Sequence, residues 1–338
     1  MSMAPVSSRR ALLKGAGSLA VAALAPSVAV SAPVPASART GPFGGVFPIG
    51  FTTDLPNGRL DYDGLASQVR FCGRGGVPGF AWPQLASGWT TLSEPERLKG
   101  AEVMVDAARQ GGPAIVVGVQ SREADFAETE RYARHAEKIG ADAVICIPPP
   151  NVSSPKDLLQ YYRRIGQVTK LPMFGQAVGP FSVDLLVEMY ETIPTFRYVK
   201  DETGDPLERV LEINRRTGGG LRSFSGFGVA TMMTEMERGF GGHCPFVSLS
   251  DLFATTYDLF HSGRRREAFD LFGRIQAASS IFGQSDINVL VARGVLKPEV
   301  TKRVAPDAPG SGARKPPVVN PDEIRRVLDV YLQPYLRA

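Results

Sequence analysis

Short apolar runs alternate with amphipathic segments along most of the chain. Each run has four to six residues, and the segment after it repeats apolar side chains at helical spacing. Parallel strands are buried on both faces and therefore read as continuous apolar runs. We interpret eight runs as strands, at residues 46–51, 79–82, 114–119, 143–147, 172–175, 196–200, 222–225 and 244–248.

A helix is predicted after each strand. The first opens near Asp61, and the second follows Ser93, with Glu96 three residues later in the pattern of a capping box. Later helices are predicted at residues 124–139, 155–168, 183–192, 207–216, 230–238 and 257–282. A Pro- and Gly-rich loop at residues 305–317 then precedes a last helix at residues 321–332.

This alternation of strands and helices indicates a parallel sheet. Eight units over about 200 residues fit a closed barrel better than an open doubly wound sheet. No Gly-x-Gly-x-x-Gly follows the first strand, which disfavours a dinucleotide-binding fold. The sequence therefore predicts an α/β fold, a (β/α)8 TIM barrel at residues 39–262 with additional C-terminal helices at residues 263–338.

Residues 1–38 are predicted to be an export signal rather than part of the fold. Arg9 and Arg10 fit a twin-arginine motif, and an apolar stretch at residues 16–25 is too short to span a bilayer. Residues 36–38 offer a small-residue cleavage site. We expect recognition by the twin-arginine export machinery, no stable membrane anchor, and a periplasmic or secreted mature protein.

The composition of the chain argues against nucleic-acid, metal and cofactor binding. A hydrophobic fraction of 43% and a charged fraction of 21% are typical of a soluble globular protein. The densest basic run, at residues 264–266, has Glu267 beside it and no interleaved aromatic residues, so nucleic-acid binding is not expected. The three cysteines and three histidines share no ligand spacing. Neither a metal site, a disulfide framework nor a cofactor is therefore predicted.

The chemistry of such a barrel is expected at the carboxyl ends of its strands. Among the residues at these ends, Lys200 is the strong nucleophile. Burial disfavours its ammonium form, and the neutral amine can condense with a carbonyl group. From the residues alone, a structural salt bridge to Asp201 or Glu202 is the more common role for such a lysine, and these acids favour its charged form.

Several segments carry a family resemblance. Lys200 is followed four and five residues later by Gly204 and Asp205, which resembles the lysine segment of the dihydrodipicolinate synthase / N-acetylneuraminate lyase family. Further similarities in the same order lie at residues 91–97, 140–144, 171–172 and 225–226. The chain is identified as a divergent exported member. The resemblance implies a Schiff-base role for Lys200, and a homo-oligomer, either dimer or tetramer.

The chain also departs from that family's pattern. Its Gly-Thr-Thr-Gly-Glu loop falls on residues 84–88, where Leu85 and Ala86 replace the threonines that hold the substrate carboxylate. The proton-transfer tyrosine falls on Gln176, whose amide cannot exchange a proton near neutral pH. A second tyrosine falls on Pro150, and Gly228 stands where sugar-acid lyases keep an acid. The nucleophile is thus present without the family's usual acid–base groups.

These observations favour a Schiff-base-forming lyase, aldolase or dehydratase that acts on pyruvate or another 2-oxo (sugar) acid. Lys200 and Gln176 are its candidate catalytic residues. The candidate substrate-binding residues are Gln84, Ser87, Ser225, Gly226 and Ser248. One alternative is a non-catalytic or regulatory barrel that binds small acids. Another is an isomerase or hydrolase that uses Glu202 or Asp201 as a base, since a fold alone does not fix a function.

Overall fold

The computed structural model describes residues 42–122, 125–149, 152–226, 229–303 and 318–338. The segment predicted to be an export signal, the loop predicted at residues 305–317, Pro150 and Gly228 lie outside these ranges. Within them, no helix combines the length and the apolar character needed to cross a membrane.

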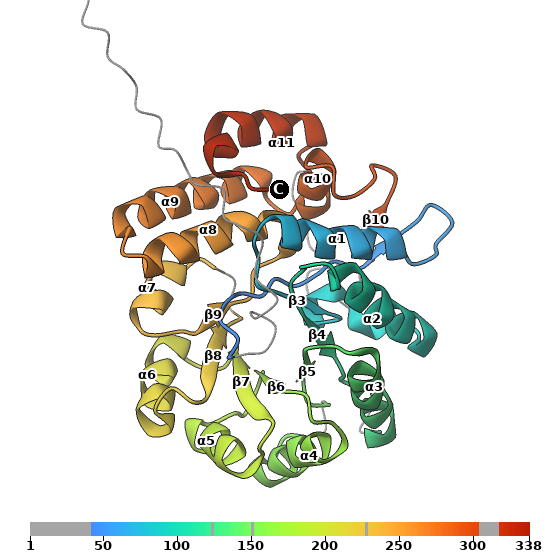
Figure 1. Ribbon diagram of the computed structural model, residues 1–338, viewed down its shortest axis with the longest axis vertical. Helices are drawn as coiled ribbons and strands as arrows, with labels where there is room; N and C mark the ends of the chain where they lie inside the picture. Colours follow the sequence, from blue (N-terminus) through green and yellow to red (C-terminus); the bar gives the residue numbers. More distant parts are fainter. Residues whose placement is uncertain (1–41, 123–124, 150–151, 227–228, 304–317) are drawn as a thin grey trace, which may run out of the picture.

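Eight parallel strands form the barrel, and a ring of helices surrounds them (Figure 1). In sheet order they are β1 (Gly45–Val46), β9 (Gly242–His243), β8 (Arg222–Ser225), β7 (Phe196–Asp201), β6 (Met173–Ala177), β5 (Ala143–Cys146), β4 (Ala114–Gly118) and β3 (Gly79–Trp82). Ile49 closes the ring, because it bridges both Ala81 of β3 and Phe246 beyond β9. The predicted (β/α)8 barrel is confirmed.

Large apolar side chains fill the barrel. Phe174 of β6 and Tyr198 of β7 stack inside it with ring centroids 4.4 Å apart, and Phe224 of β8 packs edge-on against both. Successive side chains of a strand point to opposite faces. Gln176 and Lys200 each lie two residues beyond an inward-facing ring, so they point into the barrel near its carboxyl end.

Eight helices follow the strands and pack outside the barrel. They are α1 (Tyr62–Arg74), α2 (Glu94–Ala108), α3 (Phe126–Ile139), α4 (Pro155–Val168), α5 (Val183–Thr192), α6 (Pro206–Thr217), α7 (Met232–Glu237) and α8 (Ser250–His261). Asp61 caps α1, and the capping box of Ser93 and Glu96 is present at the start of α2. Both predicted helix starts are therefore confirmed.

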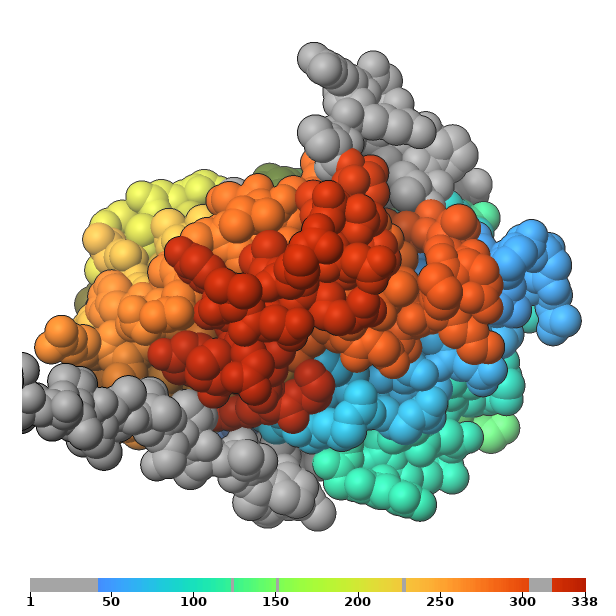
Figure 2. All heavy atoms as spheres, turned by 90° about the horizontal axis from the view of Figure 1, so that it is seen from above, coloured from blue at the N-terminus to red at the C-terminus, as the bar shows by residue number. Residues whose placement is uncertain are grey.

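The C-terminal part of the chain adds helices α9 (Arg265–Phe282), α10 (Asp286–Ala292) and α11 (Pro321–Val327). The single helix predicted at residues 257–282 is wrong in one respect. Gly263, whose φ is 82°, interrupts it, so α8 ends before α9 begins. α11 packs on α10, and Figure 2 shows this part of the chain over one face of the molecule.

The barrel strands also differ from the prediction at their ends, since β1 stops at Val46 although the first strand was expected to reach residue 51. The last strand was expected at residues 244–248, but β9 covers Gly242–His243 and a short 3-10 helix covers Val247–Leu249. Pro245 has no amide hydrogen to donate to a strand ladder, which favours the early end. A small antiparallel sheet, β2 (Thr53–Asp54) with β10 (Thr301–Lys302), was not predicted.

Candidate functional site

Lys200 lies near the carboxyl end of β7, with 4% of its surface exposed. Its Nζ atom is 3.2 Å from Oε1 of Glu202, which lies just beyond the strand. The amine and the carboxylate thus lie within hydrogen-bonding distance, which is the geometry that a proton transfer between them requires.

Gln176 contacts the same carboxylate from the neighbouring strand. It is the register partner of Lys200, and its Nε2 donates to Oε2 of Glu202 at 2.7 Å. Each oxygen of Glu202 therefore binds a different side chain. Gly226 leaves the room for this arrangement, because a Cβ atom there would come within 2.3 Å of Cγ of Glu202. The predicted residues Lys200, Gln176 and Gly226 thus meet around Glu202. The sequence suggested this acid only as the base of an alternative isomerase or hydrolase.

Asp201 is directed away from Lys200. Its carboxylate binds Nε of Arg209 on α6 at 2.9 Å, and it accepts a hydrogen bond from the backbone of Thr203. Burial raises the pKa of Asp201, and the Arg209 guanidinium opposes that rise. The two acids that follow Lys200 therefore have different partners, and Glu202 is the one in contact with the amine.

The loop after β3 is held by its own hydrogen bonds. Ser87 donates its hydroxyl to the carbonyl oxygen of Gly50 at 2.7 Å and accepts from the backbone of Gln84 at 3.1 Å. Thr52 accepts from the Trp82 indole at 2.9 Å and donates to the carbonyl of Ser87 at 2.6 Å. The hydroxyl of Ser87, a predicted substrate contact, is thus engaged in the loop itself.

Side-chain amides gather beside this loop. Nε2 of Gln84 and Nε2 of Gln120 donate to the same carbonyl oxygen, that of Pro83, at 3.3 and 3.0 Å. Among the residues that the structure describes, Oε1 of Gln84, Gln120 and Gln176 is buried without a hydrogen-bond partner. Sequence reasoning missed Gln120, although it stands one residue beyond the strand predicted at 114–119.

The two predicted serines near the last strands are engaged by carboxylates. Ser225 donates to Glu235 of α7 at 2.8 Å, and Glu235 also accepts from Nδ1 of His243 at 2.9 Å. Ser248 donates to Asp286 of α10 at 2.7 Å. The structure therefore does not bring these two hydroxyls to Lys200 and Glu202.

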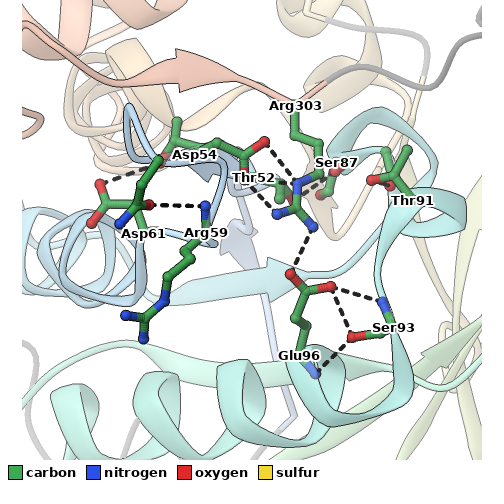
Figure 3. Close-up of polar contacts among 12 residues, drawn as sticks. Thr52, Asp54, Arg59, Asp61, Ser87, Thr91, Ser93, Glu96 and Arg303 are labelled. Carbon is green, nitrogen blue, oxygen red and sulfur yellow. Dashed lines mark hydrogen bonds and ion pairs between the residues drawn. The ribbon is translucent and has the colours of Figure 1, made fainter.

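A cluster of ionic contacts lies at the end of the first barrel strand (Figure 3). Arg303, next to β10, binds Asp54 of β2 through Nε at 2.8 Å and Glu96 of α2 through a second nitrogen at 3.0 Å. This cluster fixes a late segment of the chain beside the barrel. Among the residues described, no group of three or more His, Cys, Asp or Glu side chains could hold a metal ion.

Comparisons with known proteins agree on one family. Residues 42–265 match the dihydrodipicolinate synthetase family. The chain is 30% identical to a 4-hydroxy-tetrahydrodipicolinate synthase of Rhizobium meliloti (strain 1021) over 190 residues, which are 54% of this chain and 63% of that relative. The chain thus spans less than two thirds of the length of this relative.

Solved structures give the same picture of the fold. YagE, an E. coli K12 prophage protein of the dihydrodipicolinic acid synthase family in complex with pyruvate, aligns with a TM-score of 0.70 and 17% identity, covering 86% of this chain and 98% of that one. N-acetylneuraminate lyase from Mycoplasma synoviae aligns with a TM-score of 0.69 and 16% identity, covering 87% and 98%. At this identity the likeness concerns the fold.

Proposed function

Because the chain belongs to the dihydrodipicolinate synthetase family, we propose that it is a Schiff-base lyase, aldolase or dehydratase acting on pyruvate or another 2-oxo acid. The observation that carries this proposal is the buried contact between Lys200 and Glu202 at the carboxyl end of the barrel. The name of the Rhizobium meliloti relative and the pyruvate bound to YagE point to the same class of chemistry.

The first step of the proposed reaction is a proton transfer from Lys200 to Glu202. The neutral amine then attacks the 2-oxo carbon of the substrate, so that an N–C bond forms and the carbonyl becomes a hydroxyl group. Loss of this hydroxyl as water leaves the imine. The protonated imine accepts the electron pair of an adjacent C–C bond in an aldol or lyase cleavage, which gives an enamine. In a dehydration it accepts the pair of an adjacent C–H bond instead, and the enamine then expels a hydroxyl group that leaves with the C–O electron pair.

Glu202 also supplies the proton that the leaving hydroxyl needs. The family's tyrosine position holds Gln176, whose amide does not titrate near neutral pH. A carboxylic acid formed by the first transfer can return its proton to the departing oxygen, so the same group serves twice. Gln176 positions Glu202 by donating to the oxygen that does not face Lys200.

Borohydride trapping tests the proposal directly. The protein is incubated with pyruvate, reduced, digested and analysed by mass spectrometry, with Lys200→Arg as the matched variant. We expect a reduced pyruvate adduct on Lys200 of the native protein and none at position 200 in the variant. The absence of an adduct with every 2-oxo acid tested would contradict the imine mechanism, and so would turnover that persists in Lys200→Arg.

The ion pair itself favours one alternative. A lysine that stays charged beside Glu202 would bind a small acid without reacting, as in a barrel that kept its fold and lost turnover. Titration calorimetry with pyruvate distinguishes the two, because binding without a trapped adduct is the result expected of a binding protein.

We also propose that residues 1–38 direct export through the twin-arginine machinery and that the mature protein is a periplasmic or secreted homo-oligomer. The motif at Arg9 and Arg10 supports export, and the family resemblance supports a dimer or tetramer. Replacing both arginines by lysine should keep the precursor inside the cell. Light scattering of the purified mature protein measures its assembly, and a monomer at micromolar concentration would contradict the second part.

A further inference from the structure

A second amine stands at the same end of the barrel as Lys200. Lys302 of β10 is the register partner of Thr53, which follows the first barrel strand. Its Nζ atom lies 4.6 Å from the ring centroid of Phe51 and 5.6 Å from that of Phe246. These two rings lie 5.2 Å apart, at the carboxyl ends of the first and last strands. Lys302 therefore belongs to the edge where barrel chemistry is found.

The segment at residues 244–246, which contains Phe246, also reaches the proposed reaction centre. Cys244 lies inside the barrel two residues before Phe246, and the charges of Lys200 and Glu202 both act on its thiol. Burial raises the pKa of Cys244 to about 12, so the thiol is a neutral neighbour. Phe246 keeps 41% of its surface exposed. The chain thus runs from a neighbour of Lys200 and Glu202 to an exposed ring with an ammonium beside it.

Three other cations at this end of the barrel are already paired. Lys200 contacts Glu202, Arg209 binds Asp201, and Arg303 is shared by Asp54 and Glu96. By contrast, no hydrogen bond or ion pair joins the ammonium of Lys302 to any residue that the structure describes. Asp286 attracts it from farther away, but that carboxylate accepts the hydroxyl of Ser248.

The surroundings of Lys302 keep its backbone in place, while its side chain is exposed and has two aromatic rings on one side. Arg303 donates its backbone amide to Thr52 at 2.9 Å, and its guanidinium is held by two acids (Figure 3). Burial near the rings lowers the pKa of Lys302, and Asp286 opposes this. A cation on a fixed backbone loses less conformational freedom when it binds an anion, so more of the interaction contributes to affinity.

We propose that Lys302 binds a carboxylate of the substrate. The inference rests on the proposed function, which requires a 2-oxo acid and therefore at least one negative charge at this edge. In the loop after β3, Leu85 and Ala86 are apolar and the hydroxyl of Ser87 is already engaged. Its remaining polar side chain, Gln84, is uncharged. Of the four cations named above, Lys302 is the one without an ion pair in the described part of the chain. The carboxylate is either the one next to the 2-oxo group or a second one farther along the substrate.

The test compares three ligands that differ in charge: hydroxyacetone with no carboxylate, pyruvate with one and 2-oxoglutarate with two. Borohydride-trapped adduct on Lys200 is measured against ligand concentration for the native protein, Lys302→Met and Lys302→Arg. Lys297→Met is the matched control, since this exposed lysine lies in the same C-terminal part of the chain. Lys302→Gln replaces Lys302→Met if the latter lowers the thermal midpoint.

We expect Lys302→Met to raise the half-saturating concentration of the bound acids about tenfold, the usual effect of losing one charge-assisted hydrogen bond. A rise for pyruvate and 2-oxoglutarate alike identifies the carboxylate next to the 2-oxo group, whereas a rise for 2-oxoglutarate alone identifies the distal one. Hydroxyacetone and Lys297→Met should show no change, and Lys302→Arg should stay within a few-fold of the native protein.

Unchanged half-saturation for both acids in Lys302→Met, with normal trapping in the native protein, would overturn the role of Lys302 and leave the imine mechanism intact. If the native protein traps none of the three ligands, the imine mechanism fails separately. Titration calorimetry with pyruvate and 2-oxoglutarate then decides on Lys302: binding lost in Lys302→Met supports the inference, and binding that is unchanged or absent in the native protein refutes it.

Discussion

Gln176 and Lys200 are register partners on adjacent strands, and both side chains reach the carboxylate of Glu202. The amide holds one oxygen at 2.7 Å, and the amine lies 3.2 Å from the other. Gln176 carries a neutral amide on β6, whereas Glu202 carries an ionisable carboxyl group just beyond β7. Under the proposed mechanism, acid–base chemistry therefore lies with Glu202 beyond β7 and not with β6.

Glu202→Gln should slow imine formation about 100-fold, because the substitution keeps the shape of the side chain and removes its capacity to accept a proton. The measurement is the rate at which the borohydride-trapped pyruvate adduct appears at neutral pH. Glu208→Gln on the surface of α6 is the control and should match the native rate. Equal rates for Glu202→Gln and the native protein would assign the proton transfer to water or to the substrate's own carboxylate.

Arg209→Met should destabilise the protein by about 3 kcal/mol, because it leaves the buried carboxylate of Asp201 without its cation. Asp201→Asn removes that charge, so the double variant Asp201→Asn/Arg209→Met should be more stable than Arg209→Met alone. Urea unfolding of the four proteins gives the coupling energy. Strictly additive losses would show that the ion pair contributes nothing beyond its separate side chains.

Thr52→Val should cost about 2 kcal/mol of stability. The hydroxyl of Thr52 accepts from the Trp82 indole and donates to the carbonyl of Ser87, and both partners would be left buried and unpaired. Thr91→Val is a suitable control, since its hydroxyl makes a single contact, to the carbonyl of Gly88, and is only half-buried. Urea unfolding with similar losses for the two variants would argue against this role of Thr52.

Local signals predicted most of the barrel. α4 and α5 begin and end where the pattern placed them, because Ser154 and Ser182 cap their first turns and the apolar spacing ends with the helix. β3 and β8 also have their predicted bounds. Each of these elements is specified within a few consecutive residues, so the sequence alone carries the information.

Contacts between distant segments were not predicted, because they are not specified within a few consecutive residues. The β2–β10 sheet pairs Thr53 with Lys302, and strands of two residues have no periodicity to recognise. Strand-end reasoning named Lys200 and Gln176 as candidates, but it could not show whether a side chain faces the barrel or a helix. Ser225 follows the inward-facing Phe224 and so turns outward to Glu235.

Glu235, which accepts the hydroxyl of the outward-facing Ser225, makes the stability of the protein depend on pH. Burial by itself would raise the pKa of Glu235, but hydrogen bonds from His243, Thr231 and Ser225 hold it below its ordinary value of 4.5. A carboxyl group whose pKa is lower in the folded chain contributes stability above its unfolded pKa, and this contribution disappears as the pH falls through the folded pKa. The native protein should therefore lose stability below about pH 4.5.

Glu235→Gln removes this titration, because a neutral amide cannot gain a proton in that range. We expect a lower thermal midpoint than the native one at pH 7, where the charge-assisted hydrogen bonds are lost, and a shallower fall between pH 5 and pH 3. Thermal unfolding across this range measures both effects. Glu237→Gln, at an exposed position of the same helix, should keep the native slope, and a native slope in Glu235→Gln would place the acid sensitivity in another carboxyl group.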